Sequence, residues 1–236
     1  MRRTPAQIAA SVDAKGIYTV PAAARLLLET PATIRRWAFG YSRQGREYPS
    51  AIRTDVPEVD GERVLTFLEL VELMFVQALL GSGLSWPKVR EASRVAARLL
   101  GNEPHPFATR RWFADAAAIY LRLGHEHDEP ILIEVAGHAQ LSMEPVLKPY
   151  LKQLQFDQRG VAERWFPMGA HRPVVLDPRR AFGMPVTERA GVPTEVIAHL
   201  FQAGDSKSTI AQWYRLDEVE VDAALEFEST LASAAA

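Results

Sequence analysis

The sequence predicts a mainly α-helical protein with a small amount of β structure. Three observations lead to this fold class. Apolar residues recur with helical spacing near both ends of the chain, within residues 20–100 and 194–228. Two short apolar stretches in the middle, residues 118–123 and 131–135, have the length of strands. Gly and Pro residues stand at the breaks between these segments.

Residues 18–37, YTVPAAARLLLETPATIRRW, carry two short helix patterns joined by a tight turn. Thr19 is expected to cap a first helix over about residues 20–28. Thr30 is expected to cap a second helix that starts at Pro31, where the missing N–H of proline costs little. This pattern predicts a helix-turn-helix, an arrangement that places its second helix against DNA.

The second of these helices has distinct inner and outer faces. Helical spacing points Ile34, Trp37 and Ala38 inward. Arginine serves both base edges and phosphates, and the start of a helix attracts phosphate. A solvated basic face is the simpler alternative. The side chains that should face outward and contact DNA are Thr33, Arg35 and Arg36.

Residues 40–63 are rich in arginine and contain a hairpin-turn signal. Asp60-Gly61, flanked by Val59 and Val64, favours a tight turn between two strands, and this predicts a wing beside the helix pair. Arginines on a wing can hold the DNA backbone, although a flexible charged loop is the alternative. The arginines considered for phosphate contact are Arg43, Arg46 and Arg53, and the first two complete the expected DNA-binding set.

Two further helices are expected before residue 104. Thr66 and Glu69 form a capping box that opens a helix to about residue 80, apolar on nearly all sides and therefore central or buried in a dimer. Ser85 is expected to cap the next helix, which runs to about residue 100. Its apolar stripe is Val89, Ala92, Val95, Ala96 and Leu99.

The residue pattern of the middle of the chain differs from that of the N-terminal part. The strand-like residues 118–123 and 131–135 are expected to pair as a hairpin, followed by a short helix over 145–155 and an irregular stretch over 156–172. His125 and His127 stand beside acidic residues at the hairpin tip, but spacing fixes no third ligand, so we expect no metal site. The catalytic candidates Asp157, Glu163 and Asp177 lack a partner at a diagnostic spacing, so we expect no enzyme and no cofactor.

A third unit is expected from residue 173. Short strands over 174–176 and 184–187 precede three helices, over about 194–203, 207–214 and 218–228. The inward sets are Val196, Ile197 and Leu200; Ile210, Trp213 and Tyr214; and Val221, Ala224 and Leu225. Three helices could form a second DNA-binding unit, but acidic side chains on the last helix would repel the phosphates of DNA. These are Asp217, Glu218, Glu220, Asp222, Glu226 and Glu228.

Charge and composition bound the function. Residues 1–53 hold nine basic and three acidic residues, a net charge of +6, whereas residues 204–236 hold two basic and seven acidic residues, a net charge of −5. This asymmetry suggests two different partners. The chain has no cysteine, no secretory signal pattern and no apolar run near the roughly 20 residues of a membrane span. We expect a cytoplasmic protein that does not enter a membrane.

Two stretches resemble known families. Residues 18–37 and 64–92, including Gly83-Leu84-Ser85, resemble the MerR-type winged helix, although the wing region is longer and the long C-terminal coiled coil is missing. Residues 173–228 resemble a small helical domain found in antitoxins. Its motifs are VVLDP at 174–178, FGMPV at 182–186, GDS at 204–206 and IAQWY at 210–214.

Together the two stretches resemble the larger VapB-type antitoxins. That resemblance implies an antitoxin that neutralises a PIN-domain ribonuclease toxin of the VapC type and binds its own promoter DNA. The breaks along the chain predict three domains: a winged helix with its helix pair over 1–104, a middle segment over 105–172 and a trihelical domain over 173–236. Because one helix-turn-helix reads few base pairs, we expect a homodimer.

One alternative function stays open. The chain could be a free-standing MerR-like transcriptional regulator whose middle segment, rich in aromatic residues, holds a small ligand. The residues that suggest this are Trp112, Phe113 and Tyr120.

Overall fold

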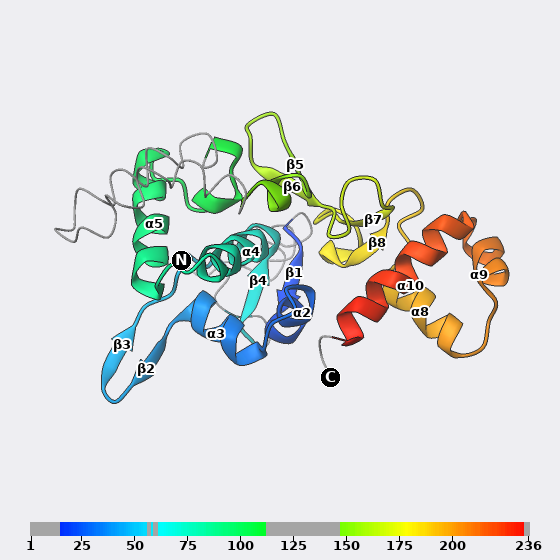
Figure 1. The fold of residues 1–236 in the computed structure, drawn as a ribbon, viewed down its shortest axis with the longest axis horizontal. Helices are drawn as coiled ribbons and strands as arrows, with labels where there is room; N and C mark the ends of the chain where they lie inside the picture. Colours follow the sequence, from blue (N-terminus) through cyan, green and yellow to red (C-terminus); the bar gives the residue numbers. More distant parts are fainter. Residues whose placement is uncertain (1–14, 56–57, 59–60, 112–146, 234–236) are drawn as a thin grey trace.

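The structure is a computed structural model that describes residues 15–55, 58, 61–111 and 147–233. It is a mixed α and β protein in which helices alternate with short strands, and its described sheets have two to four strands (Figure 1). The predicted combination of helices with small amounts of β structure is therefore correct. Within these ranges, no helix is long and apolar enough to span a membrane.

The N-terminal helix pair lies where the sequence predicts it. Strand β1 (Ile17–Thr19) leads into helix α2 (Val20–Leu26), and helix α3 (Pro31–Phe39) follows after a short turn. The side chains of Thr19 and Thr30 each accept a hydrogen bond from an amide in the first turn, at 3.3 and 3.1 Å. These caps satisfy N–H groups that have no partner inside the helix, so they fix where each helix begins.

A β-hairpin follows α3, but its turn is not the predicted one. Strands β2 (Tyr41–Arg43) and β3 (Arg46–Tyr48) are antiparallel, and they are joined through Gln44 and Gly45, which both have positive φ. The predicted turn at Asp60-Gly61 lies partly outside the described residues. The strand after it, β4 (Val64–Thr66), pairs with β1, far back in the chain, and is buried there.

Helix α4 (Phe67–Gly81) is the centre of the N-terminal half. Its capping box is present as predicted, and most of its side chains are buried. Helix α5 (Trp86–Leu99) packs against α4 and buries its predicted stripe except for Leu99, which is only partly buried. Ser85 occupies the cap position of α5, but its side chain makes no capping hydrogen bond.

The predictions for the middle of the chain are only partly testable. The two strands expected at 118–123 and 131–135, with His125 and His127 between them, lie outside the described residues. The described helical turn ends at residue 151, earlier than predicted, and strand β5 (Leu154–Phe156) follows. The irregular stretch predicted over 156–172 instead contains strand β6 (Ala162–Trp165). Strand β6 pairs with the preceding strand β5 on one side and with β7 on the other.

Strands from the middle and the C-terminal third form one antiparallel sheet. Its order is β5-β6-β7-β8, with β7 at Val174–Leu176 and β8 at Pro185–Thr187, both close to their predicted positions. A short 3-10 turn, η2 (Ala181–Gly183), joins β7 to β8. The expected domain boundary after residue 172 lies between the paired strands β6 and β7.

Three helices close the described chain. They are α8 (Thr194–Gln202), α9 (Lys207–Tyr214) and α10 (Glu218–Ser233), close to the predicted positions except that α10 extends further. Trp213 and Tyr214 were predicted to face inward, but Trp213 is 59% exposed and Tyr214 is also exposed. Helix α9 is short, and Ile210 and Ala211 already fill its contact with the core.

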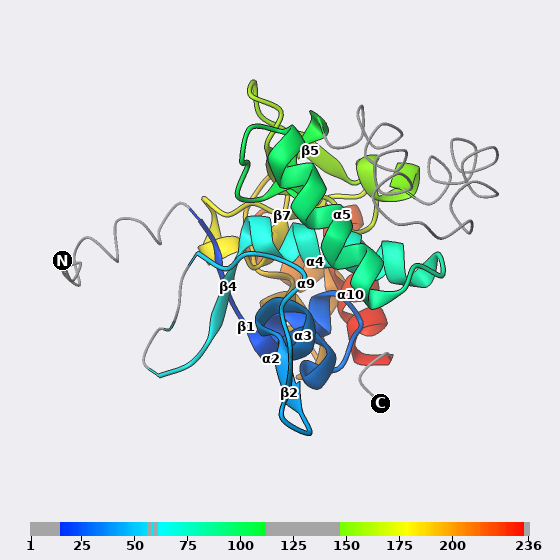
Figure 2. The same ribbon diagram turned by 90° about the vertical axis from the view of Figure 1, so that its left-hand side faces the viewer.

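Helix α10 joins the C-terminal helices to the rest of the molecule. Phe227 and Leu231 belong to the same buried cluster as Leu26 of α2 and Met74 of α4, whereas Ile210 and Val221 belong to a separate, smaller core. Figure 1 shows α10 running from α9 back toward α2, and Figure 2 shows the end of α10 beside α4. The C-terminal helices are therefore packed against the helix pair.

Candidate functional site

Helix α3 presents two arginines to solvent. Ile34 and Ala38 are buried, so Arg35 and Arg36 are exposed on the opposite side, as predicted. Thr33 is partly exposed, and its hydroxyl accepts a hydrogen bond from the Arg36 guanidinium at 3.4 Å. This face therefore offers two positive charges and a hydroxyl group to a ligand.

The β2–β3 hairpin adds two more arginines and is internally braced. Tyr41 and Tyr48 stack across the two strands with ring centroids 4.6 Å apart, and the guanidinium of Arg46 lies 5.5 Å from the Tyr48 ring. Arg43 lies opposite Arg46 beside the turn, and both are exposed. Figures 1 and 2 both show the hairpin projecting from the body of the molecule next to α3.

These four arginines are free to bind an anion. Within the described ranges, none of them forms an ion pair with an acidic side chain. Arg53, the third arginine considered for phosphate contact, is also exposed, on the segment after β3. The guanidinium carbon of Arg63 lies 5.0 Å from the centroid of the Phe39 ring. The basic face defined by α3 and the hairpin consists of Thr33, Arg35, Arg36, Arg43 and Arg46.

Several of the acidic residues of the last helix pair with basic side chains. Glu228 is buried, pairs with Arg25 of α2 and accepts a hydrogen bond from Thr194 of α8. Glu220 is also buried and lies 2.6 Å from a guanidinium nitrogen of Arg189. Further pairs join Glu226 to Arg172 and Asp222 to Lys207. These carboxylates therefore hold the C-terminal helices in place.

A polar cluster, which sequence reasoning missed, gathers at α4, with Asp55 at its exposed edge and the other members buried. It consists of Asp55, Glu69, Glu72 and His105. The His105 Nδ1 atom lies 3.0 Å from a carboxylate oxygen of Glu72, and its Nε2 atom lies 3.2 Å from a carboxylate oxygen of Asp55. Glu69 accepts hydrogen bonds from the backbone amides of Thr66 and Asp55. Three distant segments of the chain are joined here.

The electrostatics of this cluster favour positive charge on the imidazole. Burial alone would lower the pKa of His105, but the hydrogen bonds and negative charges of Glu72 and Asp55 outweigh it and raise that pKa to about 9. One sequence signal was available: Glu69 and Glu72 are two acidic residues in a helix that must be buried, and buried carboxylates need partners. Their partners could not be identified from spacing.

The acidic residues considered for catalysis have structural roles. Asp177 is buried and binds the guanidinium groups of Arg164 and Arg179 at 3.0 and 3.1 Å. It also accepts a hydrogen bond from the Arg179 amide, a contact typical of an Asp residue in a turn. Asp157 accepts hydrogen bonds within its own turn, and Glu163 pairs with Gln155 on the neighbouring strand.

The chain is similar to one protein family, one named protein and one solved structure. Residues 174–227 match the family described as "Protein of unknown function (DUF433)". The chain is 26% identical over 223 residues to the Mycobacterium tuberculosis (strain ATCC 25618 / H37Rv) protein named "Putative antitoxin VapB45", covering 89% of this chain and 92% of that protein. Its fold is similar to the crystal structure of Rv2018 from Mycobacterium tuberculosis, with a TM-score of 0.70 and 24% identity over 88% of this chain and 96% of that one.

Proposed function

We propose that this protein is the antitoxin of a toxin–antitoxin pair and that it binds its own promoter as a repressor. The observation that carries the antitoxin assignment is the similarity, over 89% of the chain, to a protein named as an antitoxin. Because this match covers most of both chains, the proposal concerns the whole chain. It assigns the protein a binding role in the cytoplasm and no catalysis.

The proposed DNA-binding element is a MerR-like winged helix formed by α2, α3 and the β2–β3 hairpin. Its support is the basic face, where Arg35 and Arg36 on α3 and Arg43 and Arg46 on the hairpin are exposed and form no ion pair with the acidic residues that the structure describes. Phosphate contacts position a protein on DNA, and arginine can also read guanine in the major groove. One such helix reads few base pairs, so the proposal includes a homodimer on a two-fold site.

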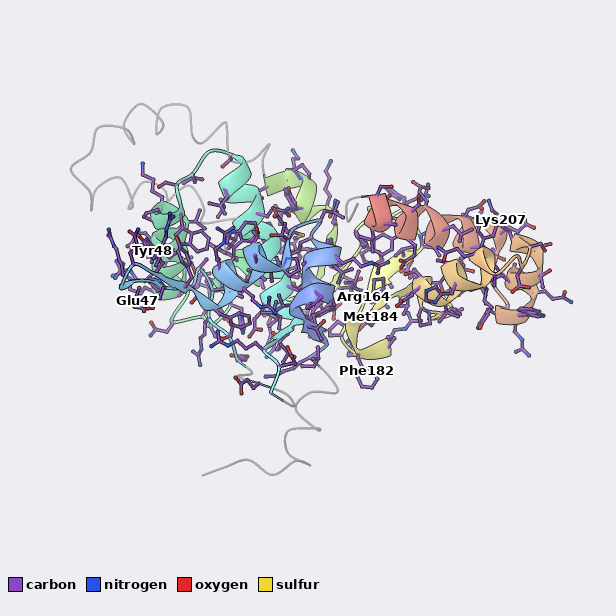
Figure 3. All side chains as sticks on the ribbon, turned by 90° about the horizontal axis from the view of Figure 1, so that it is seen from below. Glu47, Tyr48, Arg164, Phe182, Met184 and Lys207 are labelled. Carbon is purple, nitrogen blue, oxygen red and sulfur yellow. The ribbon has the colours of Figure 1, made fainter. Side chains whose placement is uncertain are left out.

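The proposed toxin-binding element is the C-terminal helical unit, and the proposed partner is a PIN-domain ribonuclease of the VapC type. Helix α9 carries exposed aromatic side chains and lies at the opposite end of the molecule from the hairpin, as the positions of Lys207 and Tyr48 show (Figures 1 and 3). Helix α10 is unsuited to DNA, because its inner face is buried and its side chains are acidic. The two partners would therefore bind at opposite ends.

A titration of labelled DNA tests the DNA-binding part. Fluorescence anisotropy with the DNA upstream of the protein's own gene should give saturable binding whose affinity falls with salt. The double variant Arg35→Ala with Arg36→Ala should bind at least about tenfold more weakly, with a salt slope reduced by about 1–2, because up to two phosphate contacts are lost.

The matched control removes the same charge from elsewhere on the surface. Arg159→Ala with Lys207→Ala deletes two exposed cations remote from α3 and should leave the affinity for DNA unchanged. Equal weakening by both double variants would show that affinity for DNA depends only on net charge, and α3 would then not be the recognition helix.

Copurification tests the antitoxin part. The tagged protein should copurify with the product of a neighbouring gene that encodes a small PIN-type nuclease, and it should inhibit that nuclease on an RNA substrate. A nuclease that neither copurifies nor loses activity would overturn the assignment while leaving the DNA-binding proposal standing.

A ligand-gated MerR-like regulator is the second candidate, and one cavity favours it. A space of about 620 Å³ lies between the helix pair, α4 and α10, and its lining includes Leu27, Met74, Tyr150, Trp165 and Phe227. This volume suits a small apolar molecule. The aromatic residues Trp112, Phe113 and Tyr120 lie outside the described residues. Ligand-dependent DNA binding by the protein alone, with no copurifying nuclease, would favour this candidate.

A further inference from the structure

The polar cluster at α4 holds an imidazole in the orientation of a metal ligand. Glu72 is fully buried and holds the Nδ1 side of the His105 ring, so the Nε2 side is directed toward Asp55. In metalloproteins the ligating histidine almost always donates its other N–H to a carboxylate or a carbonyl, which fixes the ring and makes it more basic. The Glu72–His105 pair has this arrangement.

Three possible ligand atoms converge beside that ring. They come from the Nε2 atom of His105 and from the carboxylates of Asp55 and Glu69, and all lie within 4.8 Å of one another. Ligands at about 2.0–2.2 Å from a tetrahedral ion are roughly 3.3 Å apart, which is close to the 3.2 Å between His105 and Asp55. Glu69 also accepts backbone amides, but each carboxylate oxygen has a second lone pair for an ion.

Charge and access are also consistent with a cation. Three carboxylates meet here, from Asp55, Glu69 and Glu72, whereas the cation nearest to Asp55 other than the imidazole is Lys15 at 3.6 Å, on a side chain that is 44% exposed. A cleft of about 580 Å³, lined in part by Lys15, Asp55 and His105, gives an ion a path from solvent and room for water ligands. A divalent ion at Nε2 would displace the proton that the imidazole shares with Asp55, so metal binding would release that proton, and the ion would balance the negative charge of the carboxylates.

We propose that Asp55, Glu69 and His105 bind a divalent transition-metal ion, with Glu72 as the residue that positions the imidazole. The mixture of one imidazole and two carboxylates suits Zn²⁺ better than Mg²⁺ or Ca²⁺, which prefer ligands that are all oxygen. The ion would tie the segment after the β2–β3 hairpin to α4 and to the start of η1 (Pro106–Ala108). This site is independent of the proposed DNA and toxin surfaces.

Calorimetric titration of the full chain, stripped of metal by a chelator, tests the site with ZnCl₂ as the probe. The wild type should bind one Zn²⁺ that the His105→Gln and Asp55→Asn variants bind at least about tenfold more weakly. Glu72→Gln should also weaken binding about 10–100-fold, although Glu72 would not touch the ion, because the ring loses its orienting partner. MgCl₂ should give no comparable binding.

Two control variants separate this site from other histidines. His199→Gln removes an exposed imidazole from α8, and His125→Gln with His127→Gln removes the pair that the sequence placed beside acidic residues. Both should bind Zn²⁺ like the wild type. Circular dichroism checks folding, and if His105→Gln does not fold, the partly exposed Asp55→Asn decides. Absence of Zn²⁺ binding by the wild type, or its loss only in the His125 and His127 variant, would overturn the proposal.

Discussion

The phenolic hydroxyl of Tyr18 donates a hydrogen bond of 2.7 Å to the carbonyl oxygen of Gly183, across 165 residues of chain. Tyr18 is fully buried in β1, and burial raises the pKa of its hydroxyl well above the ordinary value, so the group remains a donor at all moderate pH values. Gly183 has φ +86°, and a Cβ there would lie 2.4 Å from the Tyr18 hydroxyl. The strand that leads into the helix pair is therefore fitted closely against the turn between β7 and β8.

Tyr18→Phe should destabilise the protein by about 1–2 kcal/mol, because the buried Gly183 carbonyl loses its donor while the shape of the ring is kept. Urea unfolding monitored by circular dichroism measures the change as a lower midpoint. Tyr214→Phe removes an exposed hydroxyl from α9 and serves as the control, with an expected change within about 0.5 kcal/mol. Equal midpoints for Tyr18→Phe and the wild type would contradict the role assigned to this hydrogen bond.

The elements that sequence predicted well are those whose boundaries are set locally. Thr30 and Thr66 cap helices within four residues of themselves, so the start of α3 and the capping box of α4 could be predicted from short windows. One error came from a long-range contact, because β4 pairs with β1 and neighbouring residues do not indicate that partner. The missed strand β6 pairs with its chain neighbours β5 and β7 but lacks an alternating apolar pattern.

The candidate sites divide in the same way. Arg35 and Arg36 are adjacent on one helix face, so their exposure followed from helical spacing alone. The cluster of Asp55, Glu72 and His105 comes from three separate segments, and only the fold brings these residues together. Trp213 was misplaced because an aromatic residue at helical spacing usually faces the core, and nothing in the local sequence indicated that α9 had no core left to cover.

Arg25→Ala should destabilise the packing of α10 against α2. Glu228 is only 7% exposed, so without Arg25 its carboxylate would stay buried and would keep, among the described residues, the Thr194 hydroxyl as its hydrogen-bond donor. Removing one partner of a fully buried ion pair costs about 3–5 kcal/mol, but Arg25 is 37% exposed, so we expect about 1–2 kcal/mol. Urea unfolding measures this cost.

A second substitution checks the explanation. The double variant Arg25→Ala with Glu228→Gln no longer buries an unpaired charge and should recover part of the loss, because the amide can still accept the Thr194 hydroxyl. If the double variant is as unstable as the sum of the two single variants, the two side chains are not energetically coupled.

Asp177 should make folding sensitive to acid. Burial alone would raise its pKa, but hydrogen bonds from Arg179 and Arg164 outweigh burial and hold the pKa of this carboxyl below its ordinary value. A carboxyl whose pKa is lower in the folded state adds stability above its unfolded pKa of about 3.9, and that stability is lost as the pH falls through the folded pKa. The wild type should therefore lose stability on acidification below about pH 5.

Asp177→Asn should remove this contribution to the pH dependence. The variant should be less stable than the wild type by about 2 kcal/mol at pH 7, because two charged hydrogen bonds are weakened, and the difference should shrink toward pH 3. Urea midpoints measured from pH 7 to pH 3 give both quantities. The control is Asp217→Asn, which removes an 80% exposed carboxylate. A difference from the wild type that does not change with pH would refute this account of Asp177.

Trp213→Ala should separate toxin binding from stability, if the proposed function is correct. Trp213 is 59% exposed on α9, next to the exposed Tyr214, so its removal should change the free energy of unfolding by less than about 0.5 kcal/mol. Exposed tryptophans dominate binding energies when a partner buries them, so affinity for the purified PIN-domain nuclease should fall at least about tenfold. Calorimetry with that nuclease measures the loss.

The matched control for this variant is Phe182→Ala, since Phe182 is 65% exposed but lies on η2, away from the C-terminal helices, where its side chain points out from the ribbon (Figure 3). It should bind the nuclease with wild-type affinity, and both variants should bind promoter DNA like the wild type, because the basic face is intact. Nuclease binding that survives Trp213→Ala but is lost in Phe182→Ala would move the toxin surface from α9 to the β7–β8 turn, which Tyr18 holds against the helix pair.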